Sequence, residues 1–157
     1  MIGIILRIDF EQIGVIVAAK EKNKMLHAMF MLVILTTVIM VLTTRTRIES
    51  VKSGVVPQNY YSLMQGHDIP DFVAKTTRNF NNLFDVPTLF YAGFAVYLAL
   101  DQTGRIPVIS AWVFVTARLL HSIIHLSYNN VLHRLVIFAI GNLSILIMWL
   151  GIVNTTG

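Results

Sequence analysis

The sequence predicts an all-α integral membrane protein, built as a four-helix bundle with antiparallel up-down topology. Hydrophobic residues make up 55% of the 157 residues and charged residues only 13%, and the mean hydropathy is +0.69. Soluble domains carry about 25% charged residues, so this composition lies outside their range. Four apolar stretches are long enough to cross about 30 Å of hydrocarbon at 1.5 Å per residue. Each should be a helix, because an isolated strand would leave backbone groups unpaired in lipid.

Short connections set the order of the helices. The predicted spans cover residues 25–44, 79–100, 106–126 and 132–153. The last three spans are joined by segments 101–105 and 127–131, so they should be antiparallel neighbours. Residues 46–77 form the one long loop, in which glycines and prolines predict turns. Pro87 predicts a kink in the second span.

Residues 1–24 form an N-terminal extension to the domain at 25–153. The segment lacks the charged start, continuous apolar core and small-residue cleavage site of a signal peptide. Two interpretations stay open. In the first, Met25 is the true start of the protein. In the second, residues 13–19 form an amphipathic surface helix that ends in the basic run 20–24. The mass of the natively expressed protein distinguishes them.

The distribution of basic residues predicts the orientation. Seven lie on the side of the 46–77 loop, counted with the helix ends that face it: Arg45, Arg47, Lys52, Lys75, Arg78, Arg118 and Arg134. Five lie on the other side: Arg7, Lys20, Lys22, Lys24 and Arg105. Without residues 1–24 the second group shrinks to Arg105. The positive-inside rule then places the loop in the cytoplasm, and we expect the inner membrane of a bacterium.

The composition also limits the kinds of chemistry that the chain can perform. The chain has no cysteine, which excludes disulfides, thiolate metal sites and a cysteine nucleophile. Any thiol must therefore come from a substrate or a cofactor. The net charge of +4 is modest, and we expect no nucleic-acid partner.

Ionisable residues gather at helix ends that share one side of the membrane. Such groups are costly inside a bilayer and usually face a partner or a cavity. Arg78, Asn82 and Asp85 are spaced i, i+4, i+7 on one stripe of the second span. An unpaired carboxylate there would be costly, so a nearby arginine should hold it ionised.

The third span carries a matching stripe. Arg118, His121 and His125 are spaced i, i+3, i+7, and Arg134 enters from the fourth span. An Asp85–Arg118 pair is the simplest way to satisfy both groups. The surplus positive charge then suits an anionic ligand.

Some of these charged residues and histidines also have simpler, non-functional explanations. Arg45, Arg47, Lys52 and Lys75 are typical of cations that extend to the interface, with Arg47 the best candidate for another role. The two histidines suggest metal, but zinc needs three or four ligands and this helix supplies two. We therefore predict no metal site.

At these residues the sequence resembles the MAPEG family, the membrane-associated proteins in eicosanoid and glutathione metabolism. In the family, the second helix carries an arginine, an asparagine four residues on, an acid three further and then a proline. The matching residues here are Arg78, Asn82, Asp85 and Pro87. The third helix carries an arginine, then a tyrosine or histidine, commonly then a tyrosine, and an arginine begins the fourth. The matching residues are Arg118, His121, His125 and Arg134.

The resemblance covers about residues 25–153 and departs from the family at three places. Asp85 replaces the more usual glutamate, Pro87 follows the acid one residue early, and His125 stands where tyrosine is common. These differences leave the family resemblance in place and weaken the transfer of any particular activity.

The resemblance implies a homotrimer with glutathione between neighbouring protomers, near the cytoplasmic face. In that arrangement Arg78, Arg118 and Arg134 hold carboxylates of glutathione. Asp85 takes its amino group or orders an arginine, and Asn82 bonds its backbone; His121 and His125 complete the binding stripe. Arg134, or Arg47 from the neighbouring protomer, is the candidate catalytic residue, because an arginine stabilises the thiolate.

Three candidate functions, each from a different class, fit these observations. The first is a glutathione-dependent transferase or peroxidase that acts on lipophilic electrophiles or hydroperoxides. The second is a non-catalytic lipid-binding membrane protein of the same fold, and the intact arginine set favours the first over it. The third is a small proton-coupled transporter, which would place its ionisable site near the midplane of the membrane, whereas Asp85 lies closer to one face.

Overall fold

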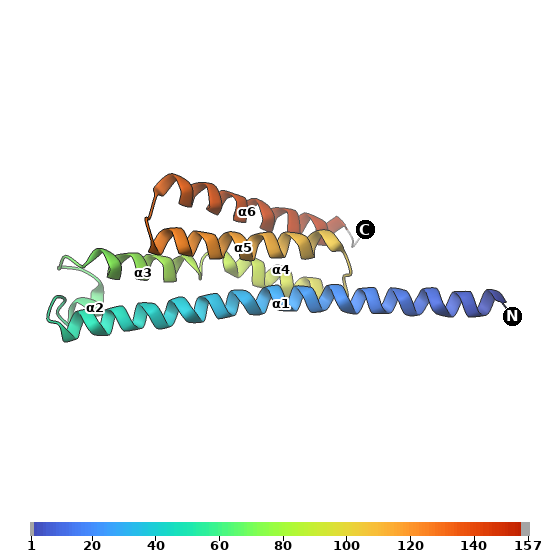
Figure 1. Ribbon diagram of the computed structural model, residues 1–157, viewed down its shortest axis with the longest axis horizontal. Coiled ribbons are helices and arrows are strands. Elements are labelled where there is room, and N and C mark those ends of the chain that lie inside the picture. The colour runs from blue at the N-terminus through green and yellow to red at the C-terminus, as the bar shows by residue number, and fades with distance from the viewer. Residues whose placement is uncertain (1, 155–157) are drawn as a thin grey trace.

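All the secondary structure of the described residues is helical. The computed structural model describes residues 2–154, with side chains from Gln12 onward. Its elements are α1 (Ile2–Lys52), α2 (Tyr60–Leu63), α3 (Asp71–Asn82), α4 (Pro87–Ala99), α5 (Arg105–Leu126) and α6 (Val131–Asn154). The long helices lie side by side in an elongated bundle (Figure 1). Both ends of the chain and the α4–α5 connection lie at one end of it, and α2 and the α5–α6 connection lie at the other.

Within residues 12–154, three helices are long and apolar enough to cross a membrane: α1, α5 and α6. Helices α5 and α6 match the predicted spans 106–126 and 132–153 to within one residue at each end. The first span lies within α1, which continues past it in both directions for 51 residues, about 77 Å at 1.5 Å per residue. Residues 2–24 continue this helix without a break.

The second predicted span is not one helix. The structure divides residues 79–100 between α3, which ends at Asn82, and α4, which begins at Pro87. Across the junction the Leu83 and Phe84 amides bond carbonyls three residues back, at 3.0 Å and 2.9 Å. Pro87 has no N–H to donate to the Leu83 carbonyl, and its ring disfavours a continuous helix through that turn. The predicted kink is therefore a complete break.

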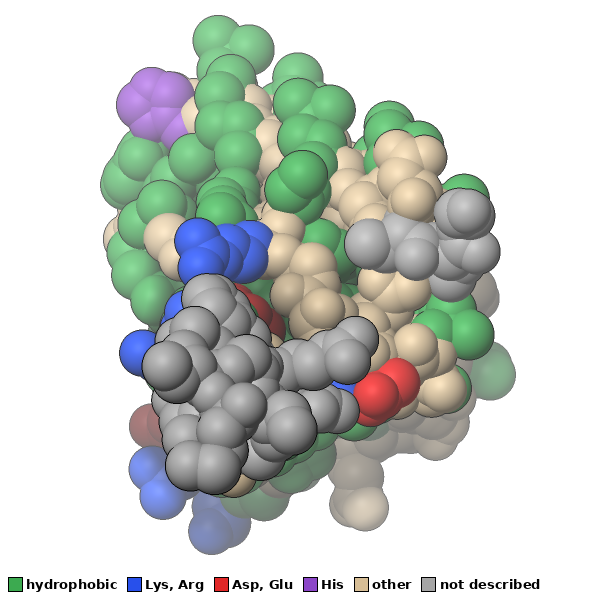
Figure 2. All heavy atoms as spheres, turned by 90° about the vertical axis from the view of Figure 1, so that its right-hand side faces the viewer, with side chains coloured by type: hydrophobic (Ala, Val, Ile, Leu, Met, Phe, Trp, Pro, Cys, Tyr) green, Lys and Arg blue, Asp and Glu red, His purple; other side chains and the backbone are tan. Residues whose placement is uncertain are grey.

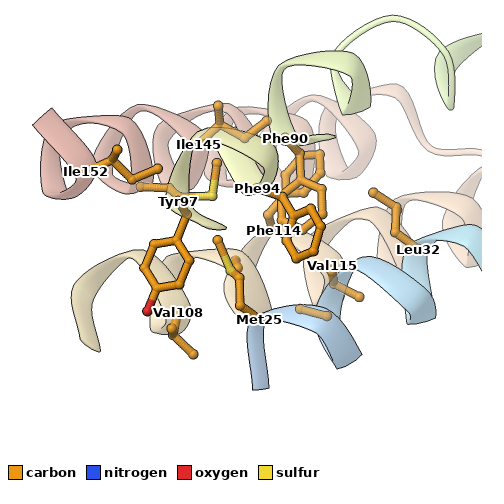
Figure 3. Packing of buried hydrophobic residues seen from close by; sticks show 13 residues of the cluster. Met25, Leu32, Phe90, Phe94, Tyr97, Val108, Phe114, Val115, Ile145 and Ile152 are labelled. Atoms are coloured by element: carbon orange, nitrogen blue, oxygen red, sulfur yellow. The ribbon is translucent and has the colours of Figure 1, made fainter. Parts of the chain in front are cut away.

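Aromatic and aliphatic side chains from α1, α4, α5 and α6 form the core (Figure 3). The Phe90 and Phe114 rings stack at its centre, with centroids 5.2 Å apart. The Tyr97 hydroxyl donates to the Gly104 carbonyl at 3.4 Å, which ties the end of α4 to the start of α5. Because lipid is as apolar as these side chains, close packing holds the helices together.

Threonines join α1 to α3 beyond this core. The Thr43 hydroxyl donates to the Thr76 carbonyl at 3.1 Å, and the Thr46 and Thr76 hydroxyls lie 3.1 Å apart. All three side chains are buried. Hydrogen bonds of this kind link helices inside membranes. They hold α3 against α1 near the end of the bundle that contains α2.

Gly93 marks the closest approach of α4 to α6. A Cβ atom added there would overlap Met148 Cε and lie 3.2 Å from Trp149 Nε1. We expect Gly93→Val to cost about 1–3 kcal/mol of stability, because the added branches force the tryptophan away from α4. Thermal unfolding in detergent measures the loss. Gly14→Val is the control, since nothing lies within 4 Å of that position. Equal melting temperatures for the two variants would contradict the prediction.

Candidate functional site

The polar stripe of α5 is buried, as the cost of its charges in a membrane requires. Arg118, His121 and His125 are 2%, 4% and 1% exposed. They face the end of α3 and the start of α6, at the end of the bundle that holds α2 (Figure 1). Asn79 and Ser122 join them, and the Ser122 hydroxyl donates to the Asn79 side-chain carbonyl at 3.2 Å.

The stripe of α3 points elsewhere than predicted. Arg78 and Asp85 are exposed and Asn82 is half-buried. The buried face of α3 carries Thr76 and Asn79 instead. The spacing predicted one face for the three residues, but α3 ends at Asn82, so Asp85 lies in the turn before α4 and does not share a helix face with Arg78 and Asn82.

The predicted Asp85–Arg118 ion pair is not formed among the described residues. The Asp85 carboxylate lies near enough to act on Arg118 electrostatically, but the Arg118 Nη2 group donates to the Asn82 carbonyl. This carbonyl comes at the last residue of α3, where the helix break removes the amide that would normally bond it. The break before Pro87 therefore supplies the acceptor that Arg118 uses.

Several buried polar atoms in this cluster lack a hydrogen-bond partner in the described part of the chain. They are Arg118 Nε, Asn79 Nδ2, Arg134 Nε and both ring nitrogens of His121 and His125. The backbone of Arg134 approaches the His121 ring without reaching hydrogen-bond geometry. Buried polar groups are normally satisfied, and leaving one unpaired costs about 1–3 kcal/mol. Such a concentration of donors and acceptors could be satisfied by a polar ligand.

The two imidazoles form an edge-to-face pair beside an aromatic ring. The His121 and His125 centroids lie 5.9 Å apart, and Phe138 lies 6.0 Å from His121 on the α6 side. The Arg118 guanidinium lies 5.9 Å from the same Phe138 ring. Among residues 12–154, no three His, Cys, Asp or Glu side chains gather as metal ligands do.

Arg134 enters the cluster from the first turn of α6. Its Nη1 group donates to the Asn129 side chain at 2.9 Å, and Asn130 caps the helix by accepting from the His133 amide at 3.1 Å. Arg134 and Arg118 both act electrostatically on His121, and Arg78 acts on Arg134. Three arginines from α3, α5 and α6 therefore share one region.

Arg47 lies apart from this group within the chain. Its Nε and Nη2 groups donate to the Thr77 hydroxyl at 3.3 Å and 3.2 Å, and its guanidinium lies 5.7 Å from the Tyr61 ring. A cleft of about 580 Å³ runs from Tyr61 along α3 to Arg78. Arg47 is thus held on the α1 side of α3, away from His121 and Arg118.

Asn79 is the polar residue that sequence inspection missed. It directly follows Arg78, so it lies about 100° around the helix from the predicted stripe. Its spacing of three from Thr76 and from Asn82 was the available signal, but a polar side chain at such spacing also fits a helix surface. The bond from Ser122 and the complete burial of Asn79 reveal its place in the cluster.

Comparison with known proteins gives one match. No curated protein and no solved structure matches the chain. The model of the MAPEG family matches residues 25–154, nearly the whole chain. The match includes the arginines, the histidines and the helix break described above, together with three helices of membrane-spanning length. The chain belongs to the MAPEG family and is an integral membrane protein associated, in general terms, with glutathione or eicosanoid metabolism.

Proposed function

We propose that this protein is a glutathione-dependent transferase or peroxidase that acts on lipophilic compounds in a bacterial inner membrane. The observation that carries the proposal is the buried cluster of arginine and histidine atoms without partners among the described residues, which lies within the stretch that the family model matches. Glutathione is an anionic tripeptide with carboxylates, amides and an amino group. It could satisfy the arginine and imidazole groups together, and no carboxylate of the described chain pairs with those arginines.

The proposed site is completed by a second protomer of a homotrimer. The exposed Arg78 and Asp85 and the half-buried Asn82 suit this arrangement, because charged groups that face lipid are costly and those that face a polar interface are not. Arg78, Arg118 and Arg134 would hold the glutathione carboxylates by charge-assisted bonds. Asp85 would accept from its amino group. The 46–77 loop and this site would then lie on the cytoplasmic side.

The chemistry depends on the glutathione thiolate. An arginine beside the sulfur lowers the cost of ionising the thiol. In transfer, the sulfur bonds an electrophilic carbon, and the leaving group departs with the electron pair of the broken bond. In peroxide reduction, two glutathione thiols are oxidised to a disulfide, while the hydroperoxide is reduced to an alcohol and water. The lipophilic partner would reach the sulfur from the bilayer, between helices.

Calorimetry of glutathione binding to the detergent-purified protein tests the proposal. We expect saturable binding, and we expect Arg118→Ala to weaken it at least about tenfold, or about 1.4 kcal/mol, because Arg118 is the most deeply buried cation of the site. Arg45→Ala is the matched control, since it removes an exposed arginine from the same end of the bundle.

Two results would count against this function. A folded, monodisperse protein that does not bind millimolar glutathione would favour the alternative of a lipid-binding protein with the same fold. Equal weakening by Arg118→Ala and Arg45→Ala would show that binding responds to overall charge and not to the buried site. Melting temperatures of both variants separate either outcome from a loss of fold.

A further inference from the structure

A second hollow has its mouth at the end of the bundle where α5 begins, opposite the end that holds α2. It is a groove of about 840 Å³ on the outer face of α5, with α1 along one edge and α6 along the other. Its walls are mostly aliphatic and aromatic: Ile109, Trp112, Val113, Leu120, Ile137 and Ile140. From Arg105 to Leu120 it follows α5 for about 22 Å at 1.5 Å per residue. This length exceeds half of the hydrocarbon thickness, about 15 Å, so an acyl chain of one leaflet fits along it.

The mouth of the groove is basic. Lys20, Lys24 and Arg105 line it, together with one acid, Glu21. Glu21 is buried and accepts from Lys24 at 2.8 Å, which leaves a net positive charge at the mouth. In Figure 2, which views this end, cationic side chains lie against a surface of hydrophobic ones. An apolar groove with a cationic end is complementary to an amphiphile that has an apolar tail and an anionic head.

A second copy of the chain is a poor match for this mouth. It would need to present an acidic group on an apolar helix. The described acids at this end are Glu21 and Asp101, and both are already paired, with Lys24 and Lys22 respectively. A phospholipid of the surrounding membrane carries both required parts, a phosphate and an acyl chain.

The groove also depends on the N-terminal part of α1. Val17, Lys20, Glu21 and Lys24 supply its α1 edge, and all four precede the family match, which begins at residue 25. The site is therefore formed by a segment outside the matched region, resting on helices within it. The groove reaches Ala117 and Leu120, at the level of Arg118, but none of the arginines and histidines proposed for glutathione lines it, so the two sites occupy different faces of α5.

We propose that this groove binds one anionic phospholipid per chain. The headgroup phosphate lies among Lys20, Lys24 and Arg105, whose positive charges attract it. One acyl chain lies along α5, between Ile109 and Leu120. The bound lipid fastens the N-terminal part of α1, which has few neighbours of its own, to α5 and α6.

Native mass spectrometry of the delipidated full-length protein tests this assignment, with phosphatidylglycerol and phosphatidylcholine as the two probes. We expect one phosphatidylglycerol per chain and a clear preference over phosphatidylcholine. Lys20→Gln and Arg105→Gln should each weaken phosphatidylglycerol binding about fivefold, the equivalent of about 1 kcal/mol. Thr116→Trp should abolish the complex without changing any charge, because Thr116 lines the groove and is exposed.

Arg45→Gln and Lys52→Gln serve as matched controls, since both residues are exposed cations at the other end of α1. Equal loss of lipid in the controls, or equal binding of the two lipids, would overturn the proposal. Variants that change the oligomeric state and leave lipid binding intact would assign the groove to a second copy. A natively expressed chain whose mass begins at Met25 would also overturn it, because Lys20 and Lys24 would be absent.

Discussion

Replacing Arg134 with alanine should lower the kcat for glutathione conjugation about 100-fold, the typical cost of removing one donor that stabilises a developing anion. Arg134 lies in the buried cluster with Arg118 and His121, and its Nε group has no partner among the described residues. If this arginine stabilises the thiolate in the transition state, kcat and kcat/KM should fall together while KM changes little, whereas a rise in the KM for glutathione would assign Arg134 to a glutathione carboxylate instead. Turnover of chlorodinitrobenzene at saturating glutathione measures the effect.

Arg47→Ala decides between the two candidate catalytic arginines. Within one chain Arg47 is held by Thr77 and Tyr61, away from the cluster, so it can act only from a neighbouring protomer. A greater loss of kcat for Arg47→Ala than for Arg134→Ala would assign the thiolate to the neighbour's arginine. If neither variant lowers kcat more than the control Arg45→Ala does, neither arginine stabilises the thiolate. Glutathione binding measured in parallel separates this outcome from failure of the site itself.

Phe114→Ala should destabilise the bundle by about 3–5 kcal/mol, the usual cost of deleting a fully buried phenylalanine. Phe114 is 1% exposed and stacks on Phe90 at the centre of the core, where α4, α5 and α6 meet. Loss of the ring leaves a cavity that neither lipid nor water fills easily. Unfolding in mixed detergent, followed by circular dichroism, measures the difference.

Leu119→Ala is the control for Phe114. Leu119 belongs to the same helix but is 45% exposed. Its truncation should cost much less, because no cavity forms and the removed atoms are replaced by lipid. Similar losses of stability for Phe114→Ala and Leu119→Ala would mean that the stacked pair does not organise the bundle.

The sequence predicted α5 and α6 closely because both are long, uninterrupted apolar stretches bounded by polar connections. The break between α3 and α4 was only partly visible. Pro87 marked its position, but proline also occurs in helices that merely bend. The turn from Leu83 to Val86 and the bond from Arg118 to the Asn82 carbonyl depend on how α3 and α4 pack against neighbours.

In the candidate site, too, the sequence predicted some features and packing decided the others. Spacing alone grouped Arg118, His121 and His125 on one face, and the structure buries that face. Spacing also grouped Arg78, Asn82 and Asp85, but it assumed a continuous helix, and the break after Asn82 leaves Asp85 outside α3. Asn79, one residue away, occupies the buried side of α3 instead. A helical repeat determines which residues share a face, whereas the rotation of the helix in the bundle is set by packing.

By itself the sequence determined the membrane class, the ends of the last two helices, the family motifs and the end of the bundle that carries the buried charges. These properties depend on hydropathy and spacing along one chain. The tertiary structure decided where the second span breaks, which polar atoms are left without partners and that the N-terminal part of α1 forms a basic groove with α5 and α6. These depend on contacts between segments far apart in sequence, and therefore on how packing orients each helix against the others.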